Sequence, residues 1–316
     1  MGWRGRIGLL ALVAAGLIAC GRGDRAPEAG PRVAFVLKTL NSPFFIEMQR
    51  GAVEAAARVG VELVVQAAER EVDVDKQMQI VENLIQTGVK ALCITPSGSK
   101  EIVPALVKAN RAGIPVVVVD TRVDPKAAEE AQVRIDAFVG SDNYEGGRLA
   151  GQHLVALRAG KARVAILEGI PGHETGDSRL KGFRDSVKDA GDLRIVASQT
   201  ANWERDQGFT VFQNLLQAHR DLDAVFACND MMALGAVEAI AAAGRTGQLT
   251  VIGFDAVEDA RKAIASGAMA ASVAQFPGEM GRRAVESAAM LIRGEKPPPD
   301  QRVRIELVTK ETLAAP

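Results

Sequence analysis

The chain has 316 residues, which is enough for two domains, and its 47% hydrophobic and 24% charged residues are ordinary for a globular protein. A formal charge of −1 at pH 7 gives no reason to expect nucleic-acid binding. Three cysteines are an odd number, so they do not form a simple disulfide framework.

Residues 1–19 have the pattern of an export signal. Two arginines precede an apolar run at 7–19, which is as long as a signal-peptide core and too short to span a bilayer comfortably. Leu-Ile-Ala-Cys at 17–20 resembles a bacterial lipobox, and an ordinary signal peptide with an incidental cysteine is the alternative. We expect a lipoprotein signal peptide, lipidation of Cys20, a flexible tether at 20–31, and work in the periplasm or at the cell surface, anchored to the membrane.

After the tether, short apolar runs alternate with helical periodicity. The strands expected in the first half are 33–37, 61–66, 91–94 and 115–119, and the helices are 43–59, 73–86 and 99–111. The spacing in the first helix predicts an inward face made of Ile46, Gly51, Val53 and Ala57. A polar loop at 120–134 then leads to an apolar run at 135–140.

The second half repeats this alternation. Its expected helices are 143–158, 175–190, 203–219, 230–243 and 256–266, and its strands are 162–168, 193–198, 223–227, 249–253 and 270–274. One more helix at about 278–293 and a final strand at about 302–308 follow. Strands that alternate with helices predict an α/β protein with doubly wound parallel sheets in two similar halves.

The end of the first strand has features of a binding site. A polar turn begins at Lys38, and Ser42 and Pro43 fit the N-cap and first position of the following helix. Phe44 and Phe45 come directly after them. Ligands of open parallel sheets bind beyond the carboxyl ends of strands, so we expect a site that hydrogen-bonds a ligand's edge and stacks on its face.

Five segments together resemble the ribose-binding branch of the periplasmic sugar-binding proteins, which have the type I solute-binding fold. They are Thr-Leu-Asn-Ser-Pro-Phe-Phe at 39–45, Ser-Asp-Asn at 141–143, Ala-Val-Phe-Ala-Cys-Asn-Asp-Met-Met-Ala-Leu-Gly-Ala at 224–236, Val-Ile-Gly-Phe-Asp at 251–255 and Val-Ala-Gln-Phe-Pro at 273–277. The resemblance implies two lobes joined by a three-segment hinge near 140–142, 275–276 and 305–306. The N-terminal lobe would then contain 32–140 plus 276–305, and the C-terminal lobe 141–275 plus 306–316.

The resemblance also implies roles for single residues. Phe44 and Phe45 look like the family's stacking aromatics on the first lobe, and Trp203 stands where the second lobe offers another ring. Asp120 looks like the carboxylate that accepts two sugar hydroxyls, and Arg179 falls on the family's ligand-binding arginine. The remaining amide and carboxylate positions fall on Asn229, Asp255 and Gln275.

Three positions depart from the ribose pattern. Lys38 and Ser42 replace a serine and an asparagine, and Thr121 follows Asp120 where the family has arginine. A moved positive charge and a larger pocket put ribose itself in doubt, so another pentose, a hexose such as allose, or a polyol fits equally well. We include Lys38 and Ser42 among the expected ligand contacts.

These expectations describe a monomeric lipoprotein that captures a monosaccharide or polyol for an ABC permease by hinge closure. A nucleoside, a furanosyl signal molecule or an amino-acid derivative as ligand is one alternative, and a sensory module for a chemoreceptor or kinase is another. No phosphate loop, dinucleotide fingerprint or hydrolase motif is present, so we expect neither enzymatic activity nor a cofactor.

Four further residues have simpler interpretations. His173 is expected in a rim loop, and no second histidine lies at metal-ligand spacing from it, so we expect no metal site. Asp230 is expected at the start of a helix. Cys93 and Cys228 are expected to be buried free thiols.

Overall fold

Short apolar strands form a six-stranded parallel sheet at the centre of the first lobe. The computed structural model describes residues 1–2 and 30–314, and Cys20 lies outside them. β4 (Val116–Val119) is four consecutive buried valines, whose branched side chains favour extended backbone. The sheet order is β11-β5-β4-β3-β1-β2, with bounds β1 (Arg32–Thr39), β2 (Glu62–Ala68), β3 (Ala91–Ile94), β5 (Ala137–Ser141) and β11 (Asp300–Val303).

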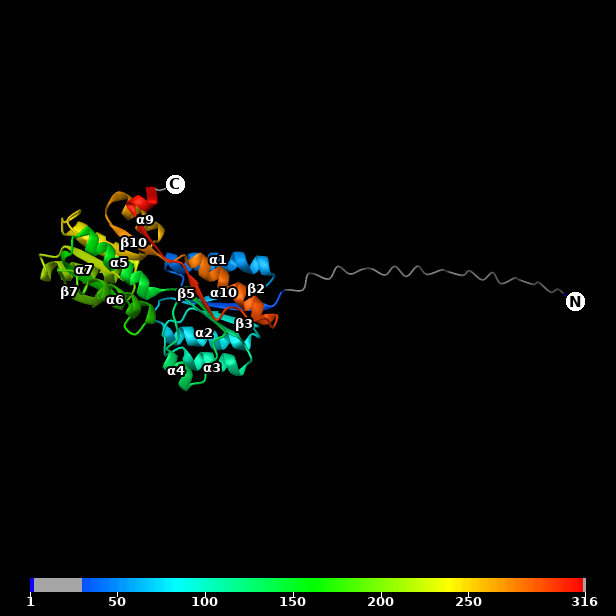
Figure 1. The fold of residues 1–316 in the computed structure, drawn as a ribbon. Coiled ribbons are helices and arrows are strands. Elements are labelled where there is room, and N and C mark those ends of the chain that lie inside the picture. Colours follow the sequence, from blue (N-terminus) through cyan, green and yellow to red (C-terminus); the bar gives the residue numbers. More distant parts are fainter. Residues whose placement is uncertain (3–29, 315–316) are drawn as a thin grey trace.

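Helices cover both faces of this sheet (Figure 1). On β1, Val33 and Phe35 join the core beneath α1 (Pro43–Val59) and α10 (Pro277–Ile292), whereas Ala34 joins the core on the opposite face. That opposite face is covered by α2 (Val74–Gln86), α3 (Val103–Arg111) and α4 (Pro125–Glu130). The alternation of side chains along a strand therefore builds two separate cores in one lobe.

The second lobe repeats the plan around the sheet β12-β10-β9-β8-β6-β7. Its strands are β6 (Lys161–Glu168), β7 (Asp192–Thr200), β8 (Ala224–Ala227), β9 (Thr250–Asp255), β10 (Ala271–Ala274) and β12 (Glu306–Thr309). Its helices are α5 (Asn143–Leu157), α6 (Glu174–Val187), α7 (Arg205–Ala218), α8 (Asp230–Ala242), α9 (Glu258–Ser266) and α11 (Lys310–Ala314). The edge strand β12 runs antiparallel to β10, while the other pairings are parallel. The predicted two-lobed α/β fold is confirmed.

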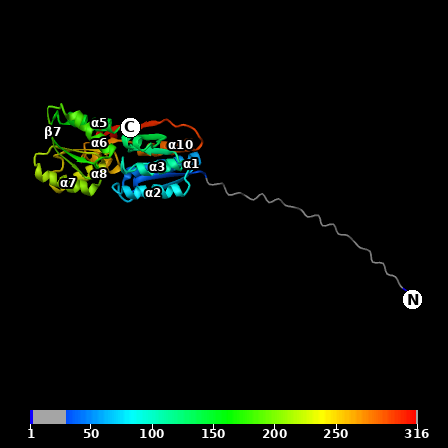
Figure 2. The same ribbon diagram turned by 90° about the horizontal axis from the view of Figure 1, so that it is seen from below.

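The chain passes between the lobes three times, and Figure 2 shows the lobes from a second side. The passages lie after β5, after β10, and between β11 and β12. They touch one another, because the Ser141 hydroxyl donates to the Gln275 carbonyl at 3.5 Å and the Arg304 guanidinium lies 4.1 Å from the Phe276 ring centroid. The single strand expected at 302–308 is wrong: two strands of different sheets flank a crossing at Arg304.

Two further expectations from the sequence are wrong. In α1, Gly51 is buried as expected, but Ala57 is exposed and Ile46 and Val53 are 51% and 49% exposed. The buried face carries Phe44, Phe45, Met48, Gly51, Ala52, Ala55 and Ala56. Small residues are required there because α1 packs closely on α10; a Cβ atom at Gly51 would clash with the Gly278 backbone. The expected loop 120–134 contains α4, whose N-cap Asp124 accepts a hydrogen bond from the Ala127 N–H.

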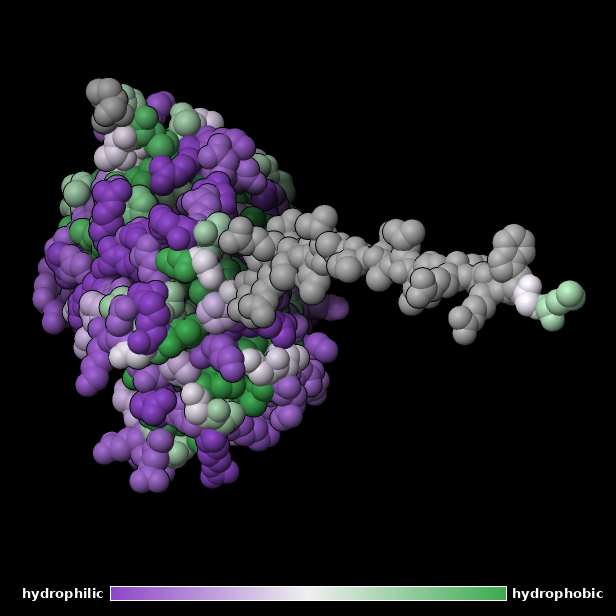
Figure 3. Space-filling view, turned by 90° about the vertical axis from the view of Figure 1, so that its right-hand side faces the viewer, coloured by the Kyte–Doolittle hydropathy of each residue, from purple (hydrophilic) through white to green (hydrophobic). Residues whose placement is uncertain are grey.

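The face of the molecule in Figure 3 is mainly hydrophilic, with small scattered apolar areas. Across residues 1–2 and 30–314, no helix has the length and apolar character needed to cross a membrane. Apolar side chains from both halves form the buried cores of the lobes.

Candidate functional site

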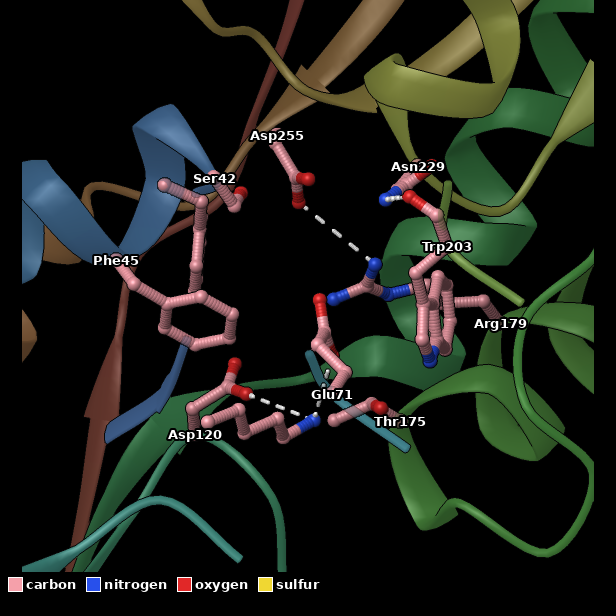
Figure 4. A pocket seen from close by; sticks show the side chains of 11 residues that line it. Ser42, Phe45, Glu71, Asp120, Thr175, Arg179, Trp203, Asn229 and Asp255 are labelled. Atoms are coloured by element: carbon pink, nitrogen blue, oxygen red, sulfur yellow. Dashed lines mark hydrogen bonds and ion pairs between the residues drawn. The ribbon is translucent and has the colours of Figure 1, made fainter. Parts of the chain in front are cut away.

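One cavity lies between the two lobes, at the carboxyl ends of their strands. About 310 Å3 of space not filled by protein atoms lies there, part of it open to solvent. Its lining residues come from both lobes: Lys38, Ser42, Phe44, Phe45, Glu71, Asp120, Thr175, Arg179, Trp203, Asn229 and Asp255. Nine of these are residues that the sequence analysis singled out, and Figure 4 shows the arrangement.

The first helix brings two rings to the cavity. Ser42 has extended backbone (φ −103°, ψ 130°) at the N-cap of α1, with no hydrogen bond from its hydroxyl to the described helix, and Pro43 fixes the first turn. The Phe44 and Phe45 rings lie edge to face, 5.2 Å apart at 86°. Phe45 and Trp203 stand on opposite sides of the cavity (Figure 4).

Asp120 follows β4 and presents a carboxylate with one free oxygen. Its backbone has φ 62°, a left-handed conformation that is uncommon outside glycine. The Thr121 hydroxyl donates to Oδ2 at 2.9 Å, whereas the buried Oδ1 has no hydrogen-bond partner within residues 30–314. A buried acceptor without a partner is costly, so Oδ1 suits a ligand hydroxyl.

Lys38 and Glu71 form a buried ion pair beside Asp120. Lys38 is 2% exposed, and its Nζ lies 3.5 Å from Glu71 and 4.0 Å from Asp120. Burial raises the pKa of Glu71, and the Lys38 ammonium opposes that rise. Glu71 is not among the predicted contacts, although its place three residues after β2 puts it near the strand end that carries Lys38.

Arg179 lies at the centre of the second lobe's contribution, on α6. Its Nε donates to Asn143 Oδ1 at 2.8 Å and its Nη1 donates to the Cys228 carbonyl at 2.7 Å. The guanidinium carbon is 3.9 Å from the Phe254 ring centroid, and Nη1 is 3.7 Å from Asp255 Oδ1. These contacts hold the planar group rigidly, which pre-organises it for a ligand.

Asp255 ends β9 and is oriented by Gln275. The Gln275 amide donates to Asp255 Oδ1 at 2.6 Å. Burial raises the pKa of Asp255 well above its ordinary value, and the Arg179 charge opposes that rise. Gln275 is fully buried and does not line the cavity, so the structure places it behind Asp255; its Oε1 has no partner among the described residues.

Asn229 and Trp203 are joined through the backbone. Asn229 is the N-cap of α8: its Oδ1 accepts from the Met232 N–H at 2.9 Å, and its Nδ2 donates to the Trp203 carbonyl at 3.1 Å. Trp203 has φ 68°, and its ring lies against Gly169, where a Cβ atom would clash with it. Asn229 therefore fixes the turn that carries Trp203.

His173 is buried, not at the rim as expected from the sequence. It is 4% exposed, and its Nδ1 accepts a hydrogen bond from Trp203 Nε1 at 3.3 Å. Thr175, in the next turn of chain, lines the cavity and was also missed. No local sequence pattern marks either residue, because the position of both side chains depends on where α6 begins.

The remaining candidate residues are structural. Asp230, the first residue of α8, is fully buried and accepts from the Ser272 hydroxyl at 2.7 Å. Cys93 and Cys228 are free and buried, as expected, and burial raises the pKa of both thiols. In the described part of the chain, no group of three or more histidine, cysteine, aspartate or glutamate residues is placed to hold a metal ion.

Two α/β lobes, three crossings and a polar cavity between the lobes define a hinged solute-binding fold. Residues 33–296 match the model of the periplasmic binding protein domain. The chain belongs to the periplasmic binding protein family.

Similar proteins extend along most of the chain. The D-ribose/D-allose-binding protein of Pseudomonas aeruginosa is 38% identical over 287 residues, which cover 88% of this chain and 89% of that protein. The ribose import binding protein RbsB of Bacillus subtilis is 40% identical over 265 residues, covering 84% and 82%. Among solved structures, a periplasmic solute-binding protein of an ABC transporter from Actinobacillus succinogenes with bound D-allose has a TM-score of 0.85 at 39% identity, covering 89% of this chain and 98% of that one.

Proposed function

We propose that this protein captures a monosaccharide or polyol of the ribose or allose kind for an ABC importer. The observation that carries the proposal is the cavity between the lobes, bounded by the Phe45 and Trp203 rings and edged by buried charged groups. A sugar has apolar C–H faces, which stack on rings, and a rim of hydroxyls, which pair with carboxylates, amides and guanidinium groups. Asp120 Oδ1 supplies an acceptor for such a hydroxyl.

The charges of the cavity favour a neutral ligand. Lys38 lies against Glu71, and Arg179 lies against Asp255, so both buried cations already face a carboxylate. An anionic ligand would have to displace these partners, and leaving a buried charge unpaired is costly. A neutral polyhydroxylated ring instead uses each charged group as a hydrogen-bond partner, with charge-assisted strength.

The relatives narrow the ligand. The names of two similar proteins specify ribose and allose. Lys38 and Ser42 replace the serine and asparagine of the ribose pattern, and we expect these two positions to set the preference among sugars.

Capture takes place by closure of two lobes around the ligand, 32–140 plus 276–305 and 141–275 plus 306–316. Contacts come from both lobes: Lys38, Ser42, Phe44, Phe45 and Asp120 from the first, and Arg179, Trp203, Asn229 and Asp255 from the second, with Gln275 acting through Asp255. A ligand that touches both sets favours the closed form. The protein acts as a monomer that delivers its ligand to the permease.

Outside the cytoplasm, a lipid on Cys20 holds the protein at the membrane. This part rests on the signal pattern of residues 1–19 and on the periplasmic family. Mass spectrometry of the mature protein tests it. A diacylated N-terminal Cys20 is the expected result, and an unmodified cysteine or cleavage elsewhere contradicts the anchor.

Isothermal titration calorimetry tests the ligand class. The panel contains D-ribose, D-allose, other pentoses and hexoses, myo-inositol and two nucleosides. Saturable binding of a sugar or polyol, with weaker or no binding of the nucleosides, is the expected result. The proposal fails if no carbohydrate or polyol binds, or if a nucleoside binds more tightly than all of them.

A further inference from the structure

His173 contacts both the Trp203 ring of its own lobe and the backbone of the first lobe. It occupies the N-cap position of α6 in the second lobe and does not line the cavity. Trp203 Nε1 is a donor only, so the hydrogen bond of 3.3 Å requires His173 Nδ1 to be unprotonated. The imidazole is therefore the neutral form with its proton on Nε2.

The His173 imidazole also reaches the first lobe. The imidazole lies near the backbone of Ser97, in the segment that follows β3, and this backbone contact raises the pKa of His173. Next to it, the Glu174 N–H donates to the Ser99 hydroxyl at 3.4 Å, so this segment meets the start of α6 at two points. The imidazole thus lies in the contact that forms when the lobes close.

The surroundings of His173 disfavour a second proton. Burial and the Lys38 ammonium, which faces the ring from β1, lower the pKa of His173 to about 3. On its own helix, the Glu174 carboxylate accepts from the Ser178 hydroxyl, and Asp177 hydrogen-bonds the Gly172 backbone. Beside Trp203, Glu204 pairs across the lobes with Arg70 at 3.8 Å.

We propose that His173 is a positioning residue that couples the orientation of the Trp203 ring to lobe closure, so that protonation of its Nδ1 opposes ligand capture. The inference rests on the proposed function. Separation of the lobes exposes the ring to solvent and takes the Lys38 ammonium away from it, so the pKa of His173 rises toward its ordinary value of 6.5; loss of the Ser97 backbone contact acts in the opposite direction. The closed form binds one proton fewer than the open form, so closure weakens as the pH falls below that value.

Calorimetry on the full chain with D-ribose, D-allose and myo-inositol at pH 7.5, 6.5 and 5.5 tests this coupling. For the wild type, linkage predicts about a tenfold loss of affinity between pH 7.5 and pH 5.5. His173→Asn keeps an oxygen that accepts from Trp203 Nε1 but cannot gain a proton. We expect its affinity to be within about threefold of wild type at pH 7.5 and to change less than twofold with pH.

The matched control is His219→Asn, at the end of α7 outside the cavity, which should keep the wild-type pH profile. A second readout needs no variant: in NMR, the His173 imidazole should titrate near pH 6.5 in the free protein and stay neutral at pH 5 with saturating ligand.

The outcomes separate the two proposals. If the probes bind with an affinity that does not vary with pH, or if His173→Asn keeps the wild-type slope, this inference is wrong while the proposed function stands. A His173 that is protonated at pH 5 in the ligand-bound protein also overturns it. If no probe and no panel sugar binds at any pH, the proposed function fails and this inference fails with it.

Discussion

Lys38 is almost wholly buried, and its ammonium group faces two carboxylates, Glu71 at 3.5 Å and Asp120 at 4.0 Å. In the opposite lobe, Arg179 faces Asp255 at 3.7 Å. Each buried charge thus has a partner before any ligand arrives, which limits the cost of removing it from water. A ligand gains from this arrangement because the charged groups are fixed in place and keep free hydrogen-bonding positions.

The carboxylate of Asp120 is the most direct test at the residue scale. Asp120→Asn keeps the shape but replaces a charged acceptor, and one of its two positions becomes a donor. We expect sugar affinity to fall by about 10- to 100-fold, because a charge-assisted hydrogen bond contributes about 1.5–3 kcal/mol. Calorimetry measures the loss. Asp75→Asn, at the exposed start of α2, is the control, and an unchanged affinity for the Asp120 variant would remove this residue from the site.

Lys38→Ser should change both ligand preference and the pH dependence of stability. The substitution leaves Glu71 buried without its cation, so the pKa of Glu71 rises above its wild-type value because nothing from Lys38 opposes the effect of burial. The folded protein then holds this proton more tightly than the unfolded chain does. Stability present below the ordinary pKa of 4.5 is therefore lost as the pH rises through the folded value.

Thermal unfolding at pH 5 and pH 8 measures this effect. Relative to wild type, Lys38→Ser should lose more Tm at pH 8 than at pH 5, and adding Glu71→Gln should remove the difference. Equal losses at both pH values would contradict the pairing. Calorimetry on the same variant should rank D-ribose and D-allose differently from wild type; an identical ranking would show that Lys38 does not set preference.

The sequence could predict the cavity's strand-end residues better than its supporting ones. Asp120 and Asp255 follow buried strands directly, and such positions meet at one edge of a parallel sheet. Glu71 sits in a charged loop and pairs with Lys38 of β1, and the buried His173 lies near Lys38 and Ser97 of the other lobe. Burial of a loop residue by a distant part of the chain leaves no local pattern to read.

At the scale of elements, the turn from β9 to α9 holds Asp255 in an unusual conformation. Asp255 has φ 110° and Ala256 has φ 52°, which cost non-glycine residues about 1–3 kcal/mol each. The Ser272 hydroxyl accepts from the Ala256 N–H at 2.9 Å and donates to Asp230 at 2.7 Å. Asp230 in turn accepts from the Val257 N–H at 2.9 Å. A buried polar network therefore maintains the turn.

Ser272→Ala should weaken both stability and binding. It leaves the Ala256 N–H without its partner, and an unsatisfied buried group costs about 1–3 kcal/mol of unfolding free energy. The relaxed turn moves Asp255, so sugar affinity should fall at least fivefold. Ser287→Ala, which removes a buried acceptor of the Gln301 amide far from the cavity, should lose similar stability and keep its affinity. Urea denaturation measures the stability of the two variants, and calorimetry measures their sugar affinity. If Ser272→Ala binds sugar as tightly as Ser287→Ala, the network has no role in binding.

Predictions of the elements themselves succeeded where one pattern dominates. β3 has the expected bounds because its apolar run is short and lies between polar turns. The inward face of α1 was right at Gly51 and wrong at Ile46, Val53 and Ala57, because close contact with α10 buries a face with small residues. The sequence predicted one strand where β11 and β12 lie, because the break between them is a crossing from one lobe to the other and has no local pattern.

At the scale of the whole molecule, the two lobes meet around the cavity through a few polar contacts. The Glu174 N–H reaches Ser99, and Arg70 lies 3.8 Å from Glu204 on an exposed surface. Exposed ion pairs contribute little, so these contacts alone do not hold the lobes together. We therefore expect a ligand that touches Phe45 and Asp120 on one side and Trp203 and Arg179 on the other to supply the differential free energy for closure.

Fluorescence of Trp203 gives a direct test of capture between the lobes. Trp3 and Trp203 are the two tryptophans of the sequence, so a chain without residues 1–19 contains Trp203 alone. Its fluorescence therefore reports the second lobe's side of the cavity. Titration of the mature protein with the panel sugar that binds most tightly in calorimetry should give a saturable change with the same Kd. A sugar that binds in calorimetry without changing Trp203 fluorescence, or a panel in which no carbohydrate changes it, would contradict capture between the lobes.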